Sequence, residues 1–178
     1  LEAWQENTPE VVCEASATAY FFACKLYDVL RVPVGLITAD KGASPIEAWM
    51  SRDILEKEFP GEISEFEDNP PGSCYDSMIA PIIPYTFKGM LWYQGENNIF
   101  SYRQYINLQP RFVQMIREEF QNPDAPFYFV QIAPYHFDAI AHHPIEYQVY
   151  QVAQHVMDAQ RQVGEQMPEY RDDVVHYS

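Results

Sequence analysis

The segment from Gly89 to Asn98 has the sequence GMLWYQGENN. Its apolar first half, Gly89 to Tyr93, stops abruptly at the polar cluster Gln94 to Asn98. This pattern is typical of a buried strand that ends at the edge of a sheet. In open α/β sheets, ligands bind beyond the carboxyl ends of the strands. The segment therefore predicts a buried strand and a candidate functional site directly after it.

Segments with helical apolar spacing alternate with short β-rich runs on both sides of this strand. The expected helices are 15–30, 101–120 and 145–163, and the further expected strands are 32–37 and 126–132. Pro110 is expected to kink the second of these helices or to mark a boundary in it. Alternating helices and strands imply a parallel sheet that is covered by helices on both faces.

A further helix is expected to begin at Ser44 and to run through Lys57. Ser44, Pro45 and Glu47 have the spacing of an N-cap, a first-turn proline and an acid three residues after the cap. The stretch 59–72 that follows is rich in proline, glycine, asparagine and acid, so it predicts a surface loop.

Length and composition indicate one packed domain over residues 1–178. The chain has 178 residues, of which 47% are hydrophobic, and 26 acids against 11 bases give a net charge of −15. Such a field repels phosphate backbones and anionic lipid headgroups, so we expect no nucleic-acid or membrane partner. No apolar run approaches the roughly 20 residues that span a bilayer.

Neither the cysteines nor the histidines predict a metal or redox site. The three cysteines contain no C-x-x-C pair. His142 and His143 are adjacent and should point apart in extended backbone, so an ion shared with His136 is not expected. Surface loops are the default interpretation of these histidines, and we expect no cofactor.

The turn after the first expected strand and the cluster after Gly89 to Tyr93 together suggest an oxyanion hole. Gly42 allows a tight turn whose backbone N–H groups face an anion, and Gln94 supplies a side-chain amide as a second donor. The alternative for either residue alone is purely structural: Gly42 closes a turn and Gln94 caps a strand.

Five stretches resemble the sialate O-acetylesterases, which are carbohydrate esterases of the SGNH hydrolase superfamily. They are SATAYFF at 16–22, VPVGLI at 32–37, SPIEAWMS at 44–51, MIAPIIPYTFKGMLWYQGENN at 78–98 and PFYFVQIAPY at 126–135. The resemblance implies an α/β fold, a three-layer α/β/α sandwich with a parallel sheet. It also implies removal of O-acetyl groups from sialic acid or a related sugar by a serine nucleophile, a histidine base and an aspartate.

The resemblance implies roles for particular residues of this chain. Gly42 matches the oxyanion glycine turn and Gln94 matches the amide that points into the site. Glu96 matches a carboxylate expected to hold loop backbone near the nucleophile. The alternative is a general acid, which we favour less because no second carboxylate of matching context accompanies Glu96, as a glycosidase pair requires. Trp49 and Asn98 are the substrate-binding candidates, Trp49 because a flat ring suits a sugar face and Trp92 belongs to a buried strand.

Two departures from the family pattern concern the catalytic triad. The chain contains no Gly-Gln-Ser-Asn motif, which carries the nucleophile in the family. Ser44 is the nearest serine by location, but its capping role already explains it, so we do not assign it as nucleophile. Asp173 and His176 have the family's D-x-x-H spacing without the following proline, and an irregular tail is the alternative. Ala43 replaces the second glycine of the turn.

The sequence therefore predicts the later portion of such an esterase, without the strand that brings the nucleophile. Its expected partners are an acetylated carbohydrate and a second polypeptide or subunit that supplies the missing strand. The family resemblance suggests a secreted, periplasmic or lysosomal location. The alternative function is a carbohydrate-binding or structural fragment that kept the scaffold and lost catalysis.

Overall fold

The computed structural model describes residues 4–61, 67–133 and 146–167. The chain forms two compact units, residues 1–40 and residues 41–178, and each is described by itself. The expectation of one domain over the whole chain stays a prediction. Asp173, His176 and the histidines His136, His142 and His143 lie outside the described residues.

The first unit consists of two helices followed by irregular backbone. Helix α1 (Pro9–Glu14) begins after Thr8, and α2 (Ala17–Leu30) begins after Ser16; each of these hydroxyls accepts a backbone N–H of the first turn. Helix α2 confirms the prediction for 15–30. The strand predicted at 32–37 is wrong, because the segment pairs with no strand of the described chain. β-Branched residues favour a strand only where a partner satisfies the backbone.

The second unit opens with a turn that leads into two short helices. The 3₁₀-helix η1 (Ile46–Trp49) and the α-helix α3 (Arg52–Glu58) replace the single helix predicted from Ser44. Ser51 is the N-cap of α3, because its hydroxyl accepts the backbone N–H of Ile54. The prediction of Ser44 as an N-cap is wrong, since its hydroxyl donates to the carbonyl of Lys41 and accepts from the Trp49 indole.

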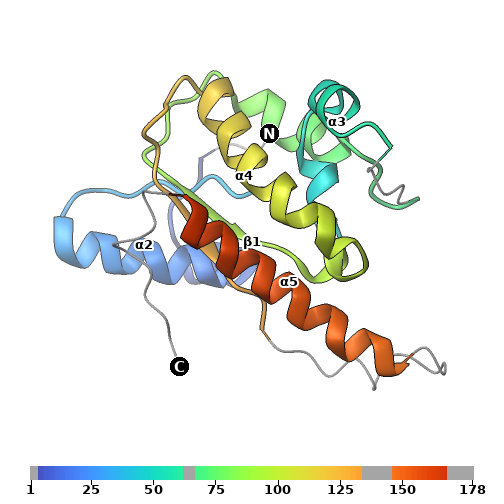
Figure 1. Cartoon of the computed structure of the whole chain (residues 1–178). Helices are drawn as coiled ribbons and strands as arrows, with labels where there is room; N and C mark the ends of the chain where they lie inside the picture. Colours follow the sequence, from blue (N-terminus) through green and yellow to red (C-terminus); the bar gives the residue numbers. More distant parts are fainter. Residues whose placement is uncertain (1–3, 62–66, 134–145, 168–178) are drawn as a thin grey trace. The chain divides into compact units, whose positions relative to one another are not determined.

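The remaining elements form a β-α-β unit with a covering helix. The π-helical turn η2 (Tyr75–Ile79) and the 3₁₀-helix η3 (Ala80–Ile82) precede the strand β1 (Met90–Tyr93). The 3₁₀-helix η4 (Glu96–Ser101) and helix α4 (Tyr102–Glu119) lead to strand β2 (Phe127–Val130), and α5 (Glu146–Gln166) follows. Figure 1 labels β1, α4 and α5. These elements confirm the predicted strands at 89–93 and 126–132 and the helices at 101–120 and 145–163.

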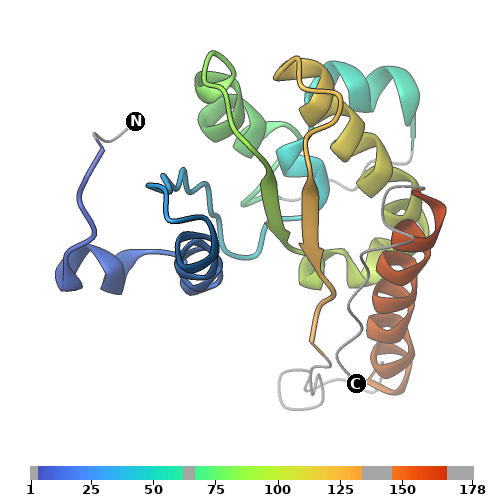
Figure 2. The same ribbon diagram turned by 90° about the vertical axis from the view of Figure 1, so that its left-hand side faces the viewer.

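The two strands are parallel, with Trp92 opposite Phe129 and Tyr93 opposite Val130. Figure 2 shows β1 and β2 side by side, with α4 and α5 on the same side of the pair. Within the described part of this unit the other face carries Tyr93 and Val130, which are 51% and 40% exposed. The predicted α/β class with a parallel sheet is confirmed, and this unit as described covers one face of its two-stranded sheet.

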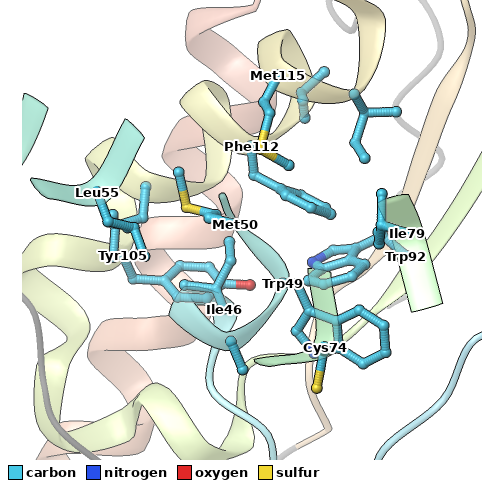
Figure 3. Close-up of a cluster of buried hydrophobic side chains, with 14 of the residues drawn as sticks. Ile46, Trp49, Met50, Leu55, Cys74, Ile79, Trp92, Tyr105, Phe112 and Met115 are labelled. Atoms are coloured by element: carbon cyan, nitrogen blue, oxygen red, sulfur yellow. The ribbon is translucent and has the colours of Figure 1, made fainter. Parts of the chain in front are cut away.

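Aromatic side chains fill the space between the sheet and α4. The ring of Trp92 lies 4.4 Å from that of Phe112 on α4 and 5.9 Å from that of Trp49. Figure 3 shows these rings together with Ile46, Met50 and Tyr105 in the same cluster. Helix α4 runs unbroken through Pro110, so the boundary expected there is absent. This core fixes the ends of β1 and α4, where the polar residues of the site lie.

Substituting Gln109 of α4 is expected to stabilise the protein, whereas most core substitutions lower the free energy of unfolding. Its side chain is 0% exposed, and neither amide atom has a hydrogen-bond partner among the described residues. An unsatisfied buried amide costs free energy, whereas an apolar side chain of similar shape does not. We expect Gln109→Met to raise the free energy of unfolding by about 1 to 2 kcal/mol in urea denaturation.

Gln114 of the same helix provides the control for this prediction. Its side chain is exposed and bonds Glu118 at 2.7 Å, so Gln114→Met should change the free energy of unfolding by about 0.5 kcal/mol or less. If Gln109→Met destabilised the protein more than Gln114→Met, the amide of Gln109 would have a partner, and this assignment would be wrong.

No helix in the described ranges is long and apolar enough to cross a membrane. Cys13, Cys24 and Cys74 are free thiols.

Candidate active site

The turn before η1 has left-handed backbone at Ala43 rather than at Gly42. Ala43 has a φ of 53°, in the left-handed region that favours glycine, whereas Gly42 is outside that region. A Cβ built at Gly42 meets no atom within 4 Å. Alanine in place of glycine at position 43 therefore carries backbone strain.

Ala43 therefore predicts a stabilising substitution. Left-handed backbone costs a non-glycine residue about 1 to 2 kcal/mol, and glycine loses about 0.4 to 1 kcal/mol through the entropy of the unfolded chain. We expect Ala43→Gly to raise the free energy of unfolding by about 1 kcal/mol. Ala80 has a φ of −53° and is the control. There the same substitution should lower stability, and a loss of similar size at both positions would contradict strain at Ala43.

Two asparagines hold the turn from the outside. The side-chain amides of Asn69 and Asn97 both donate to the carbonyl oxygen of Ala43, at 2.9 and 2.7 Å. Asn69 follows the segment 62–66, and Asn97 lies in η4 directly after β1. Because Ala43 has left-handed backbone, its carbonyl oxygen lies outside regular secondary structure. The two amides supply the hydrogen bonds that this oxygen would otherwise lack.

Two further carboxamides hold the turn from beneath. The amide nitrogen of Gln94 donates to the carbonyl of Ser44 at 3.1 Å and to Oδ1 of Asn98 at 2.6 Å. The same Oδ1 accepts the backbone N–H of Ile46 at 2.8 Å. The polar cluster after β1 thus contacts the turn at three successive points, at Ala43, Ser44 and Ile46.

A buried carboxylate completes this inner layer. Nδ2 of Asn98 donates to Oε2 of Glu47 at 2.8 Å and to the hydroxyl of Ser101 at 3.1 Å. Glu47 and Asn98 are both 0% exposed. Buried polar groups persist where they are hydrogen-bonded. The turn therefore rests on a fully enclosed polar layer.

Helices α4 and α5 tie this layer to the ends of both strands. The Tyr105 hydroxyl donates to Oε1 of Gln94 at 3.1 Å. Nε2 of Gln160 donates to the carbonyl of Gln94 at 2.8 Å, and its Oε1 accepts the N–H of Ile132 at 2.9 Å. Burial raises the pKa of the Tyr105 phenol, so this hydroxyl stays protonated and remains a donor at neutral pH.

An open cavity of about 520 Å³ lies over the turn. It is lined by Lys41, Gly42, Ala43, Glu67, Asp68, Asn69 and Asn97. The backbone N–H groups of Gly42 and Ala43 have no acceptor in the part of the chain that the structure describes. Two neighbouring free N–H groups beside a cavity are suited to stabilising a negative oxygen.

The sequence-predicted residues Gly42 and Gln94 are brought together, but they differ in access. Gly42 lines the cavity, whereas Gln94 is 7% exposed and is not among the lining residues. Both amide hydrogens of Gln94 bind Ser44 and Asn98, so donating to a substrate oxygen requires releasing one of them. The structure presents Gln94 as a support of the turn rather than as a free oxyanion donor.

The buried carboxyl that contacts the polar cluster after β1 is that of Glu47, which accepts from the Asn98 side chain, and the role expected of Glu96 stays a prediction. Glu96 lies in the first turn of η4, is exposed, and makes no hydrogen bond with the described residues. By its spacing from Ser44, Glu47 matches the acid of a capping box. The signal in its favour is an acid inside the apolar run Ile46 to Met50, where a charge needs an internal partner.

Trp49 and Asn98 do not face the cavity, so the structure corrects their expected substrate-binding role. Trp49 is 4% exposed, and its indole N–H donates to the hydroxyl of Ser44 at 2.8 Å. Its ring packs edge-on against Trp92. The side chain of Asn98 is hydrogen-bonded within the inner layer, to Gln94, Glu47 and Ser101. Both residues shape the turn from within, and Asn69 and Asn97 are the side-chain amides that reach the cavity.

Comparison with known proteins agrees with the resemblance in the sequence. A family model described as carbohydrate esterase, sialic acid-specific acetylesterase, matches residues 4–178. Sialate O-acetylesterase of Homo sapiens is 37% identical over 112 residues, which cover 59% of this chain and 21% of that protein. The Rattus norvegicus sialate O-acetylesterase is 29% identical over 161 residues, covering 67% of this chain and 30% of that protein.

A solved structure extends the agreement to three dimensions. The crystal structure of a carbohydrate acetylesterase from Xanthomonas citri matches with a TM-score of 0.72 and 27% identity, covering 88% of this chain and 34% of that one. This chain thus spans about a third or less of the length of these proteins. The match over residues 4–178 includes the turn, the polar cluster after β1 and α5. The chain belongs to the carbohydrate esterase family of sialic acid-specific acetylesterases.

Proposed function

We propose that this chain is the part of a carboxylic ester hydrolase that supplies the oxyanion-binding turn for removal of O-acetyl groups from sialic acid. The observation that carries the proposal is the pair of backbone N–H groups at Gly42 and Ala43, which line the open cavity and have no acceptor among the described residues. Membership of the acetylesterase family supports the reaction class. The names of the relatives support sialic acid as the sugar.

The proposed reaction follows the serine-hydrolase sequence. A serine hydroxyl attacks the acetyl carbonyl, a histidine takes its proton, and the carbonyl oxygen becomes negative in the tetrahedral intermediate. The N–H groups of Gly42 and Ala43 stabilise this oxygen. Collapse of the intermediate breaks the bond between the acetyl carbon and the sugar oxygen, which takes the proton from the histidine and leaves as a hydroxyl, while the acetyl group stays on the serine. Water then attacks the acetyl-serine with the histidine as base, and acetate leaves.

The remaining catalytic groups are also part of the proposal. The 178 residues contain no Gly-Gln-Ser-Asn sequence, so we assign the nucleophile to a segment outside them, carried by the same protein or by a second polypeptide. Asp173 and His176 are the proposed orienting acid and base. An acetylated carbohydrate is the proposed substrate, and the mechanism requires no cofactor.

Release of acetate from O-acetylated sialic acid by the intact protein tests this function. The intact protein should release acetate and react with a serine-directed phosphonate, whereas the 178-residue chain alone should do neither. His176→Ala should abolish acetate release in the intact protein. Binding of the sugar without acetate release would instead identify a carbohydrate-binding scaffold. Hydrolysis by the 178-residue chain alone would place the nucleophile within it and contradict our assignment.

A further inference from the structure

We infer that Glu47 is a positioning residue of this site, which acts through Asn98 to hold Gln94 and the Ala43 to Ile46 turn. The inference rests on the proposed function for its catalytic consequence. Glu47 is not among the residues that line the cavity. Its carboxylate lies instead at the base of the inner layer, 2.8 Å from Nδ2 of Asn98.

The side-chain amide of Asn98 has an oxygen, which only accepts hydrogen bonds, and a nitrogen, which only donates them. The N–H of Ile46 is only a donor, so it requires the oxygen of the Asn98 amide. Oε2 of Glu47 accepts the N–H of Nδ2 of Asn98 at 2.8 Å, so position 47 presents an acceptor to the nitrogen of that amide. Glu47 and Ile46 together permit one orientation of Asn98.

The orientation of Asn98 in turn sets that of Gln94. With Oδ1 of Asn98 facing it, Gln94 must present its own nitrogen, which also reaches the carbonyl of Ser44. The oxygen of Gln94 is then left to accept the Tyr105 hydroxyl. A rotated Asn98 amide would place nitrogen against nitrogen at Gln94 and at Ile46, and the turn would lose both supports.

Residue 47 must present a hydrogen-bond acceptor to Asn98. Substitutions can distinguish this requirement from the requirement that a side chain fill the space. Glu47→Leu removes the acceptor. Glu47→Gln keeps one, because its amide oxygen can occupy the same place. Asn98→Asp sets two carboxylates face to face. Combining Glu47→Gln with Asn98→Asp exchanges the carboxyl and carboxamide groups between the two positions and restores a donor–acceptor pair between residues 47 and 98.

The experiment measures two quantities in the intact protein. The first is the hydrogen-exchange protection of the Gln94 side-chain amide by NMR. Every variant retains this amide, and its protection reports on the layer without activity. The second is kcat and KM for an acetyl ester. Glu58→Gln is the control, because it makes the same chemical change at a carboxylate that bonds Arg111 on α4, away from the layer.

We expect Glu47→Leu and Asn98→Asp each to lower amide protection and kcat by about 10-fold or more, with KM within about 3-fold. Glu47→Gln and Glu58→Gln should stay within about 3-fold of wild type. The combined variant should recover to within about 3-fold of Glu47→Gln, which makes the two changes strongly non-additive. If Glu47→Leu fails to fold, the comparison of Asn98→Asp with the combined variant decides the question.

Unchanged amide protection in Glu47→Leu, or an Asn98→Asp loss that Glu47→Gln does not rescue, would overturn the positioning role. Failure of the proposed function is a separate result. A wild-type protein that releases no acetate contradicts the esterase proposal, while the exchange data still decide whether Glu47 orients Asn98 and Gln94.

Discussion

Gly95→Ala is expected to lower the free energy of unfolding by about 3 kcal/mol or more, because it combines backbone strain with overpacking. Gly95 has a φ of 149°, which side-chain-bearing residues rarely adopt. A Cβ there would lie 2.8 Å from Cγ2 of Ile132 and 2.9 Å from Nε2 of Gln160. Both neighbours are buried and packed, so neither can move away cheaply.

The glycine permits the close approach of α5 to the end of β1. Nε2 of Gln160 reaches the carbonyl of Gln94 at 2.8 Å only because no side chain stands at position 95. An added methyl group must displace Gln160 or Ile132, and displacement breaks the bond that joins the ends of the two strands. We therefore expect Gly95→Ala to loosen the whole layer beneath the turn as well as to destabilise the fold.

Urea unfolding of the intact protein measures this effect, with Gly42→Ala as the matched control. A Cβ at Gly42 meets nothing within 4 Å and φ there is outside the left-handed region, so the control should cost about 0.5 kcal/mol or less. Equal stability of the Gly95→Ala and Gly42→Ala proteins would show that the contacts around Gly95 relax freely, contrary to our interpretation.

The regular elements that the sequence predicted are those with a strong local pattern. Helices α2, α4 and α5 carry apolar residues at helical spacing, and β1 and β2 are short apolar runs bounded by polar or turn residues. The segment 32–37 has the same local pattern as a strand but no strand partner in the described residues. Strand formation depends on a neighbour, which a local pattern does not report.

The error at Ser44 has a comparable origin. Ser44 and Glu47 match a capping box, and each is taken by a tertiary partner instead: the Trp49 indole bonds the Ser44 hydroxyl, and Asn98 bonds the Glu47 carboxylate. Asn98 is distant from Glu47 in the sequence. Local capping rules therefore compete with long-range hydrogen bonds, which win here because they are buried.

The candidate site was predicted in outline and missed in detail. The rule that functional groups gather at strand ends pointed to Gln94, which follows β1 and bonds Ser44 of the turn, although the strand expected before Gly42 is absent from the described residues. It could not show that Gln94 is enclosed, because enclosure depends on Tyr105 and Gln160 from two later helices. The same absence of long-range information made Trp49 resemble a sugar platform, although it is a core residue.

The central claim is that the backbone N–H groups of the turn stabilise the oxyanion, and Gly42 allows a direct test. Proline at position 42 removes the N–H, while alanine keeps it and meets no neighbouring atom. Loss of one oxyanion donor typically lowers kcat by about 100- to 1000-fold. The unfolding temperatures of both variants serve as the folding control.

We expect the intact Gly42→Pro protein to hydrolyse an acetyl ester with a kcat about 100-fold or more below wild type, and Gly42→Ala to remain within about 3-fold. A folded Gly42→Pro protein that hydrolyses the ester at the wild-type rate would contradict the account.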